Sequence, residues 1–147
     1  MPKLSGMSGF LDPIRQKMVA ATPEEGVRQA LVEWLIREKG VPRHLMETEC
    51  GLNRIKPGAK GRVDLLVHGF RQGRKVNRPW LLAECKRPGE TDWALLEVQV
   101  NRYLKIVQPE YLLLAIGADV RIFQMQTGTP QSPSIQPILD LPSFNLD

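Results

Sequence analysis

Cysteine and histidine are scarce in this 147-residue chain, which has two of each. Neither Cys50 nor Cys85 has the neighbours of a metal-binding cysteine, and His44 and His68 are too far apart to suggest a zinc site. No apolar run approaches the roughly 18 residues of a membrane span, and the first residues lack the apolar core of a signal peptide. These absences favour a cytoplasmic protein with one domain-sized core and no membrane association.

Acidic residues are also scarce in one long stretch that is rich in lysine and arginine. Between Asn53 and Pro88 the only carboxylates are Asp64 and Glu84, and Lys86 follows Glu84 by two residues. Because only two acids occur among so many basic residues, we infer that their positions serve a specific purpose. They are therefore the first candidates for a functional site.

Residues 62–68 and 79–86 are predicted strands, because each is short, apolar and bounded by Gly, Pro or basic residues. Side chains alternate along a strand, so Glu84 and Lys86 project on the same side. If Asp64 faces the same way from a neighbouring strand, the two carboxylates repel unless a cation lies between them. Mg²⁺ prefers such oxygen ligands, and Lys86 is then placed to orient a water or to stabilise charge on a phosphate.

The order Asp64, then Glu84-x-Lys86, resembles the signature of the PD-(D/E)xK nuclease superfamily, without the proline before the aspartate. Gln99 and Tyr103 lie four residues apart, which places both on one face of a predicted helix. They look like the Q-x-x-x-Y element of the RecB-like branch and of type I restriction subunits. The closest resemblance is to the amino-terminal endonuclease domain of those restriction subunits, although Asn-Gly is replaced by Ile-Gly at the last turn.

This resemblance implies a Mg²⁺-dependent DNA endonuclease that hydrolyses phosphodiester bonds, with Mn²⁺ able to substitute. It implies that Asp64 and Glu84 are metal ligands together with the backbone carbonyl of Cys85, and that Lys86 is the catalytic lysine. The alternatives are a solvated ion pair on an edge strand for Glu84 and Lys86, and a turn cap for Asp64. Surface ion pairs contribute only about 0–1 kcal/mol, so stability alone does not require one here.

The same resemblance implies that Gln99 and Tyr103 border the site, where they contact the DNA backbone or brace the metal ligands. For Tyr103 the alternative is core packing under the sheet.

A carboxylate from the first helix, predicted over residues 23–39, often completes the site in such nucleases. Glu24 lies at the edge of the apolar stripe of that helix, whereas Glu25 points nearly away from it, so Glu24 is preferred. Glu25 is predicted to form a capping box with Thr22, and either acid could simply complement the helix dipole. The stripe consists of Val27, Ala30, Leu31, Trp34 and Leu35.

Basic residues gather before and after the predicted Asp64 strand, in a chain with a net charge of +4. Cationic loops of this kind suit phosphate contacts that add affinity without reading sequence, although a solvated basic turn is the plainer explanation. The predicted DNA-binding residues are Arg54, Lys56, Lys60, Arg62, Arg71, Arg74, Lys75 and Arg78.

The predicted elements have an α/β order, with an αβββαβ core like that of restriction endonucleases. A short helix or arm over residues 9–20 precedes the first helix. Strands are predicted near 46–53, 62–68 and 79–86, a helix over 92–107 from Thr91 or Asp92, and strands near 111–116 and 120–125. The crossover through the second helix predicts a mixed sheet of about four to five strands with helices on its faces. The expected domains are an arm over 1–21, a nuclease-like domain over 22–126 and a Pro-rich strap or partly disordered tail over 127–147.

Two other functions remain open. The chain could be an inactive nucleic-acid-binding or assembly module with the same fold. It could also be an accessory protein that works with a separate helicase or other restriction-modification subunits, because it contains no G-x-x-x-x-G-K-[ST] phosphate loop. Cutting both strands of a duplex usually needs two sites, which a homodimer would supply.

Overall fold

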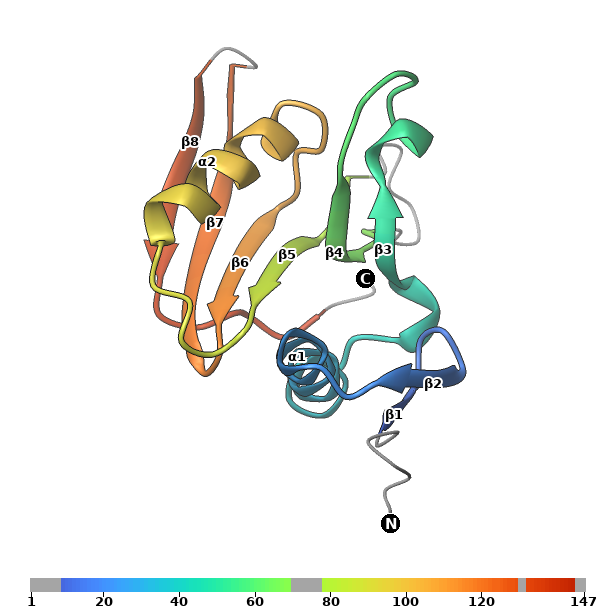
Figure 1. Cartoon of the computed structure of the whole chain (residues 1–147). Helices are drawn as coiled ribbons and strands as arrows, with labels where there is room; N and C mark the ends of the chain where they lie inside the picture. The colour runs from blue at the N-terminus through green and yellow to red at the C-terminus, as the bar shows by residue number, and fades with distance from the viewer. Residues whose placement is uncertain (1–8, 70–77, 130–131, 145–147) are drawn as a thin grey trace.

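The structure is a computed structural model that describes residues 9–69, 78–129 and 132–144 (Figure 1). Within these residues two α-helices accompany a small hairpin and a larger sheet. The elements in chain order are β1 Gly9–Asp12, β2 Lys17–Ala20, α1 Pro23–Lys39, β3 Met46–Gly51, β4 Arg62–Val67, β5 Leu81–Lys86, α2 Trp93–Leu104, β6 Tyr111–Ile116, β7 Asp119–Thr129 and β8 Ser132–Ile138, with short 3-10 turns at Arg43–Leu45 and Leu52–Arg54.

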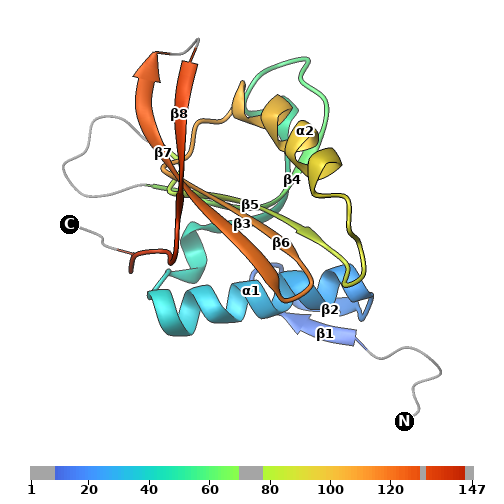
Figure 2. The same cartoon turned by 90° about the vertical axis from the view of Figure 1, so that its left-hand side faces the viewer.

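The larger sheet has six strands in the order β3-β4-β5-β6-β7-β8. Only β5 and β6 pair in parallel among these strands, because α2 carries the chain from one to the other, and the remaining neighbours are antiparallel. Helix α1 lies on one face of the sheet and α2 on the other (Figure 2). The expected α/β fold with a mixed sheet is confirmed.

Alternation along β5 divides the core between the two faces of the sheet. Leu81, Ala83 and Cys85 belong to the cluster that packs against α1. Leu82 belongs to the opposite cluster, which packs against α2. Both faces of the strand are therefore buried, as is typical of a central strand between helices.

Helix α1 begins and ends where the sequence signals predict. The Thr22 hydroxyl accepts a hydrogen bond from the Glu25 amide at 3.1 Å, and Pro23 occupies the first turn. Gly40 ends the helix with a left-handed φ of 70°. The other half of the capping box is not used, because the Thr22 amide donates to the Ala20 carbonyl instead.

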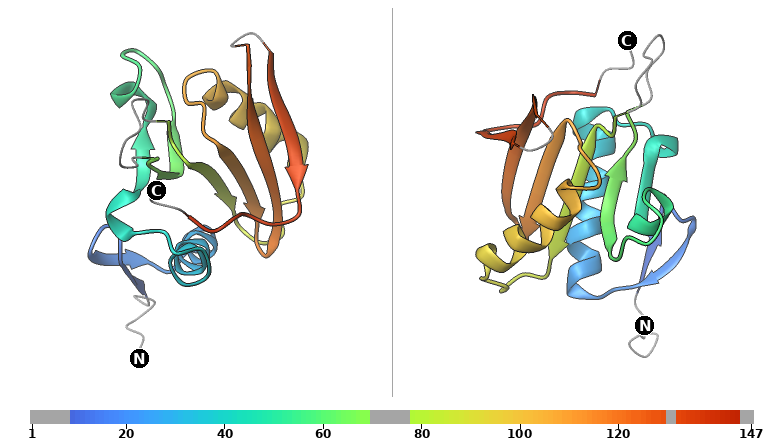
Figure 3. Two further views of the ribbon diagram at one scale, coloured as in Figure 1. Left: turned by 180° about the vertical axis from the view of Figure 1, so that it is seen from behind. Right: turned by 90° about the horizontal axis from the view of Figure 1, so that it is seen from above.

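Residues 9–20 were predicted as a short helix or arm, and the helix is wrong. These residues form the antiparallel hairpin β1–β2, which lies beside α1 (Figure 3). The turn begins at Asp12, whose carboxylate accepts from the amides of Ile14 at 2.7 Å and Arg15 at 3.2 Å. This local capping of the turn, followed by strand pairing, replaces the helical hydrogen bonds.

The tail predicted over residues 127–147 contributes a sixth strand. β8 pairs antiparallel with β7 and forms one edge of the sheet. An edge strand tolerates proline because one row of its amides has no partner strand, and here Pro137 lies opposite Phe123. None of the described helices is long and apolar enough to cross a membrane.

Candidate active site

Asp64 and Glu84 meet where strands β4 and β5 part. The two strands pair from Val67–Leu81 to Leu65–Ala83, and the next pair in this register would be Asp64 and Glu84. Instead of a backbone ladder, the acids make reciprocal contacts across the gap. The Asp64 amide donates to Glu84 Oε1 at 3.0 Å, and the Cys85 amide donates to Asp64 Oδ2 at 2.8 Å. The structure therefore brings the two predicted acids together.

Burial makes this pair of acids electrostatically unfavourable. Glu84 is 2% exposed. Burial, and then the nearby Asp64 charge, raise the pKa of Glu84 to about 9. Burial also raises the pKa of Asp64, although the Cys85 amide and the Arg28 charge oppose this rise. The pair therefore holds a proton at neutral pH unless another cation takes its place.

Lys86 and Glu24 lie close enough to the pair to affect it. The Lys86 charge opposes the rise in the pKa of Glu84. Burial, followed by the Asp64 charge, raises the pKa of Glu24, and Lys86 opposes that rise as well. Glu24 is thus the acid of the first helix turn whose pKa responds to the charges of Asp64 and Lys86.

The oxygen donors at this site fit a hard divalent cation. Two buried carboxylates that repel each other are relieved by a cation between them, and Mg²⁺ takes oxygen ligands of this kind. In the described parts of the chain, however, no three His, Cys, Asp or Glu side chains are grouped closely enough to hold a metal. Glu24 therefore lies near Asp64 and Glu84 without completing a ready-made cluster of three side chains.

Arg28 also reaches the site, although no sequence pattern indicated it. Arg28 is 8% exposed. Its Nε and Nη2 each donate to Glu25 at 2.8 Å, and its Nη1 donates to Glu49 Oε1 at 2.6 Å. The same Nη1 lies 3.9 Å from Asp64 Oδ1. A buried guanidinium thus joins the first helix to the candidate site.

Glu49 reaches Arg28 from an irregular point in β3. The flanking pairs with β4 are Thr48–Leu65 and Cys50–Val63, and Glu49 itself has a φ of 54°. Left-handed backbone in a residue other than glycine is strained and often marks functional sites.

Glu25 is buried rather than exposed, which corrects the prediction from the helix stripe. It is 6% exposed and accepts hydrogen bonds from Arg28, from Arg15 at 2.6 Å and from Gln29 at 3.3 Å. The hairpin covers this side of α1, so the buried face is wider than its apolar residues indicate. Ala30, which was assigned to the stripe, is exposed.

Replacing Glu25 with alanine is expected to destabilise the protein by about 3–5 kcal/mol, because it removes the carboxylate that Arg15 and buried Arg28 share. The Arg28 hydrogen bonds lower the pKa of Glu25 from 4.5 to about 2, with a further contribution from Arg15. This stabilisation is fully present above pH 4.5 and is lost as the pH falls towards 2. Urea unfolding of both proteins across this range measures the difference.

The matched control is Glu33→Ala on the same helix. Glu33 pairs with Arg37 in the open, where the two side chains are 58% and 75% exposed, so its loss should cost less than about 1 kcal/mol. A Glu25→Ala protein as stable as this control would contradict the structural role of Glu25.

Gln99 and Tyr103 form a pair beside the loop that precedes Asp64. Gln99 Nε2 donates to the Tyr103 hydroxyl at 2.9 Å, and Tyr103 is 4% exposed in the α2 core cluster. A Cβ on Gly61 would lie only 3.0 Å from the Tyr103 ring, and Gly61 has a φ of 112°. Core packing of Tyr103 is confirmed, and its ring also supports the approach to β4.

The predicted DNA-binding residues differ in whether their side chains are exposed or already paired with an acid. Lys56 and Lys60 are exposed. Arg54 pairs with Glu47, and Arg62 Nη1 lies 3.2 Å from Glu49.

Arg78 has a structural role that the sequence did not indicate. It donates to the carbonyls of Gln108, Pro109 and Met125 at 2.9–3.1 Å, so it links the chain before β5 to β7. Arg71, Arg74 and Lys75 lie outside the described residues.

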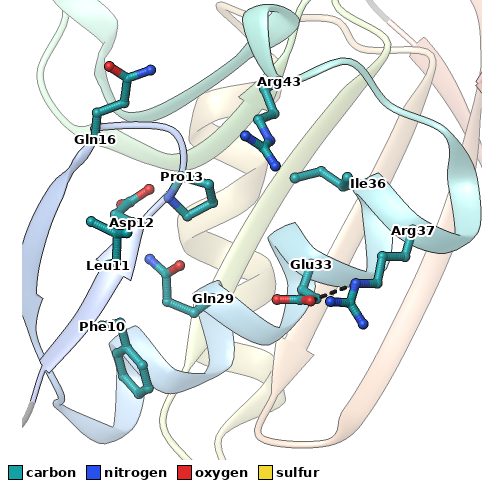
Figure 4. Close-up of a pocket in the computed structure, with 10 residues that line it drawn as sticks. All are labelled: Phe10, Leu11, Asp12, Pro13, Gln16, Gln29, Glu33, Ile36, Arg37 and Arg43. Carbon is teal, nitrogen blue, oxygen red and sulfur yellow. Dashed lines mark ion pairs between the residues drawn. The ribbon is translucent and has the colours of Figure 1, made fainter.

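A cleft lies away from these acids, between the hairpin and α1. Its volume is about 540 Å³. Figure 4 shows that Phe10 and Pro13 of the hairpin line it together with Gln29 and Glu33 of the helix. This cleft lies on the side of α1 where the hairpin is anchored.

A comparison with protein families found a match. Residues 23–142 match the model described as "Type I restriction enzyme R protein N terminus". Searches of curated proteins and of solved structures gave no match. The matched range includes every element from α1 to β8 and begins after the hairpin.

Proposed function

The chain belongs to the type I restriction enzyme R protein N-terminal family, which supports a nuclease-related role, and from this premise we propose that it is a metal-dependent deoxyribonuclease domain. The observation that carries the proposal is the meeting of Asp64 and Glu84 in one buried place beside Lys86. A fold that only needed stability would not place two repelling acids together.

Each residue has a distinct task in this proposal. Asp64 and Glu84, together with the Cys85 carbonyl, hold Mg²⁺ or Mn²⁺, and Glu24 approaches from α1. The bound ion would polarise the scissile phosphate and lower the pKa of the attacking water. Lys86 places its ammonium beside the same phosphate, where it stabilises negative charge or orients the water.

The substrate in this proposal is DNA, held through its phosphates. Lys56 and Lys60 are exposed on the loop before β4, and Arg62 opens that strand. Contacts of this type give affinity without sequence specificity. The family suggests that the partner is a restriction-modification complex. A separate translocating subunit is a further partner in this proposal.

The test is a Mn²⁺ titration of the wild-type protein by calorimetry, combined with a plasmid-cleavage assay. Binding at or below millimolar metal and metal-dependent cleavage are the expected results, and chelation by EDTA should stop the reaction. No heat of binding at millimolar Mn²⁺ would instead favour an inactive nucleic-acid-binding or assembly module. Binding without cleavage, followed by cleavage once an ATP-driven partner is added, would place the activity in a larger complex.

A further inference from the structure

A chain of charged hydrogen bonds runs from the hairpin to the candidate site. Arg15 Nε donates to Asp12 Oδ2 at 2.5 Å, and its Nη2 donates to Glu25 Oε1 at 2.6 Å. Glu25 in turn accepts two bonds from Arg28. Asp12 is 0% exposed, so the chain begins at a buried anchor. The hairpin lies before the family match, so its link to α1 involves residues that the match does not cover.

The Arg28 guanidinium is held on three of its sides. Glu25 binds Nε and Nη2, while Glu49 binds Nη1, so the planar group cannot turn without breaking several short bonds. Its charge is therefore fixed 3.9 Å from Asp64 Oδ1. The other oxygen of Asp64 accepts from the Cys85 amide. Asp64 thus lies between a fixed cation and a fixed amide donor.

We propose that Arg28 is a positioning residue, which aims the Asp64 carboxylate at the metal, and that Glu25 and Glu49 hold Arg28 in place for this task. The inference rests on the proposed role of Asp64 as a ligand. Groups that orient a metal ligand typically change metal affinity about 10- to 100-fold when they are replaced. Lysine cannot replace arginine here, because an ammonium lacks the planar fork that binds Glu25 and Glu49 together.

The test compares two variants, Arg28→Lys and Glu49→Gln, with a control, Glu47→Gln. Glu47 lies on β3, as Glu49 does. Arg28→Lys keeps the positive charge, so any effect comes from geometry. Glu49→Gln replaces the charge-assisted bond to Nη1 with a weaker neutral one. Nη1 is then held less firmly and can turn towards Asp64, where the guanidinium competes with the metal. Glu47 pairs with Arg54 and with His68, and its replacement removes a negative charge without touching Arg28.

The first measurement needs no metal. The backbone amide signal of Cys85 in NMR spectra reports on Asp64, because that amide donates to Asp64 Oδ2. We expect this signal to shift in both variants and to stay in place in Glu47→Gln. The second measurement is the Mn²⁺ dissociation constant by calorimetry, which should rise about 10- to 100-fold in the two variants and less than about twofold in the control. Thermal unfolding identifies the folded variants.

These readouts separate the possible failures. If Arg28→Lys does not fold, Glu49→Gln decides, because the Glu49 side chain is 34% exposed and its change leaves the Glu25–Arg28 bonds intact. An unmoved Cys85 signal in a folded variant overturns the inference, even if Mn²⁺ affinity falls, since Glu49 would then act as a ligand itself. A wild-type protein that binds no Mn²⁺, with a Cys85 signal that still moves in the variants, would overturn the proposed function alone.

Discussion

Lys86→Ala is expected to lose cleavage by a factor of at least about 10²–10⁴, while it keeps its fold and its affinity for Mn²⁺. Lys86 is half-buried at the end of β5, and its charge acts on both Glu84 and Glu24. In the proposed mechanism this ammonium would stabilise charge in the transition state but would contribute no metal ligand. Plasmid cleavage, Mn²⁺ calorimetry and thermal unfolding of the same preparation measure the three properties separately.

The control for this variant is Lys105→Ala, at the exposed end of α2. Lys105→Ala lowers the net charge of the protein by one, as Lys86→Ala does. A general loss of attraction to DNA would therefore reduce cleavage in both variants. Cleavage by Lys86→Ala at the wild-type rate would take Lys86 out of the mechanism.

Glu84→Gln is expected to abolish Mn²⁺ binding and cleavage without reducing stability in EDTA at neutral pH. Burial and the nearby Asp64 charge raise the pKa of Glu84 to about 9, which favours the neutral acid at neutral pH, and the amide closely imitates that form. Its oxygen can still accept from the Asp64 amide. Because the wild-type acid must take up a proton on folding at neutral pH and the amide need not, the free energy of unfolding should be unchanged or higher.

Calorimetry with Mn²⁺ and urea unfolding in EDTA measure these two effects. Glu97→Gln serves as the control, because Glu97 is exposed on α2 and pairs with Arg121 at 3.6 Å. A large loss of stability in Glu84→Gln would mean that Glu84 is a structural residue, and retained Mn²⁺ affinity would remove it from the metal site.

Most of the sheet and both helices were predictable, because their capping and turn residues and their apolar patterns indicate the same elements that the structure contains. The start of α1 at Thr22 and Pro23 is a capping signal that the structure uses. The meeting of Asp64 and Glu84 was also predictable, since alternation places each acid on a known side of its strand. Their reciprocal bonds to backbone amides could not be predicted, because these depend on how β4 and β5 separate.

The hairpin and the burial of Glu25 escaped prediction for one physical reason. The helix stripe was drawn from apolar residues alone, whereas the hairpin buries a charged side of α1 through paired ions. A signal was present in Asp12-Pro13, a dipeptide that favours a turn over a helix. The pairing of Arg28 with Glu49 joins elements far apart in the chain, and no local pattern contains that information.

The outer edge of β8 affects how copies of this molecule can meet. Residues 133, 135 and 137 of a strand direct their amides to the same side, and two of them are prolines, which have no amide hydrogen to donate. That rim is therefore a poor template for a strand from another molecule, which protects the sheet against end-to-end polymerisation. Two copies that associate to cut both strands of a duplex would have to meet through helices, loops or the opposite rim at β3.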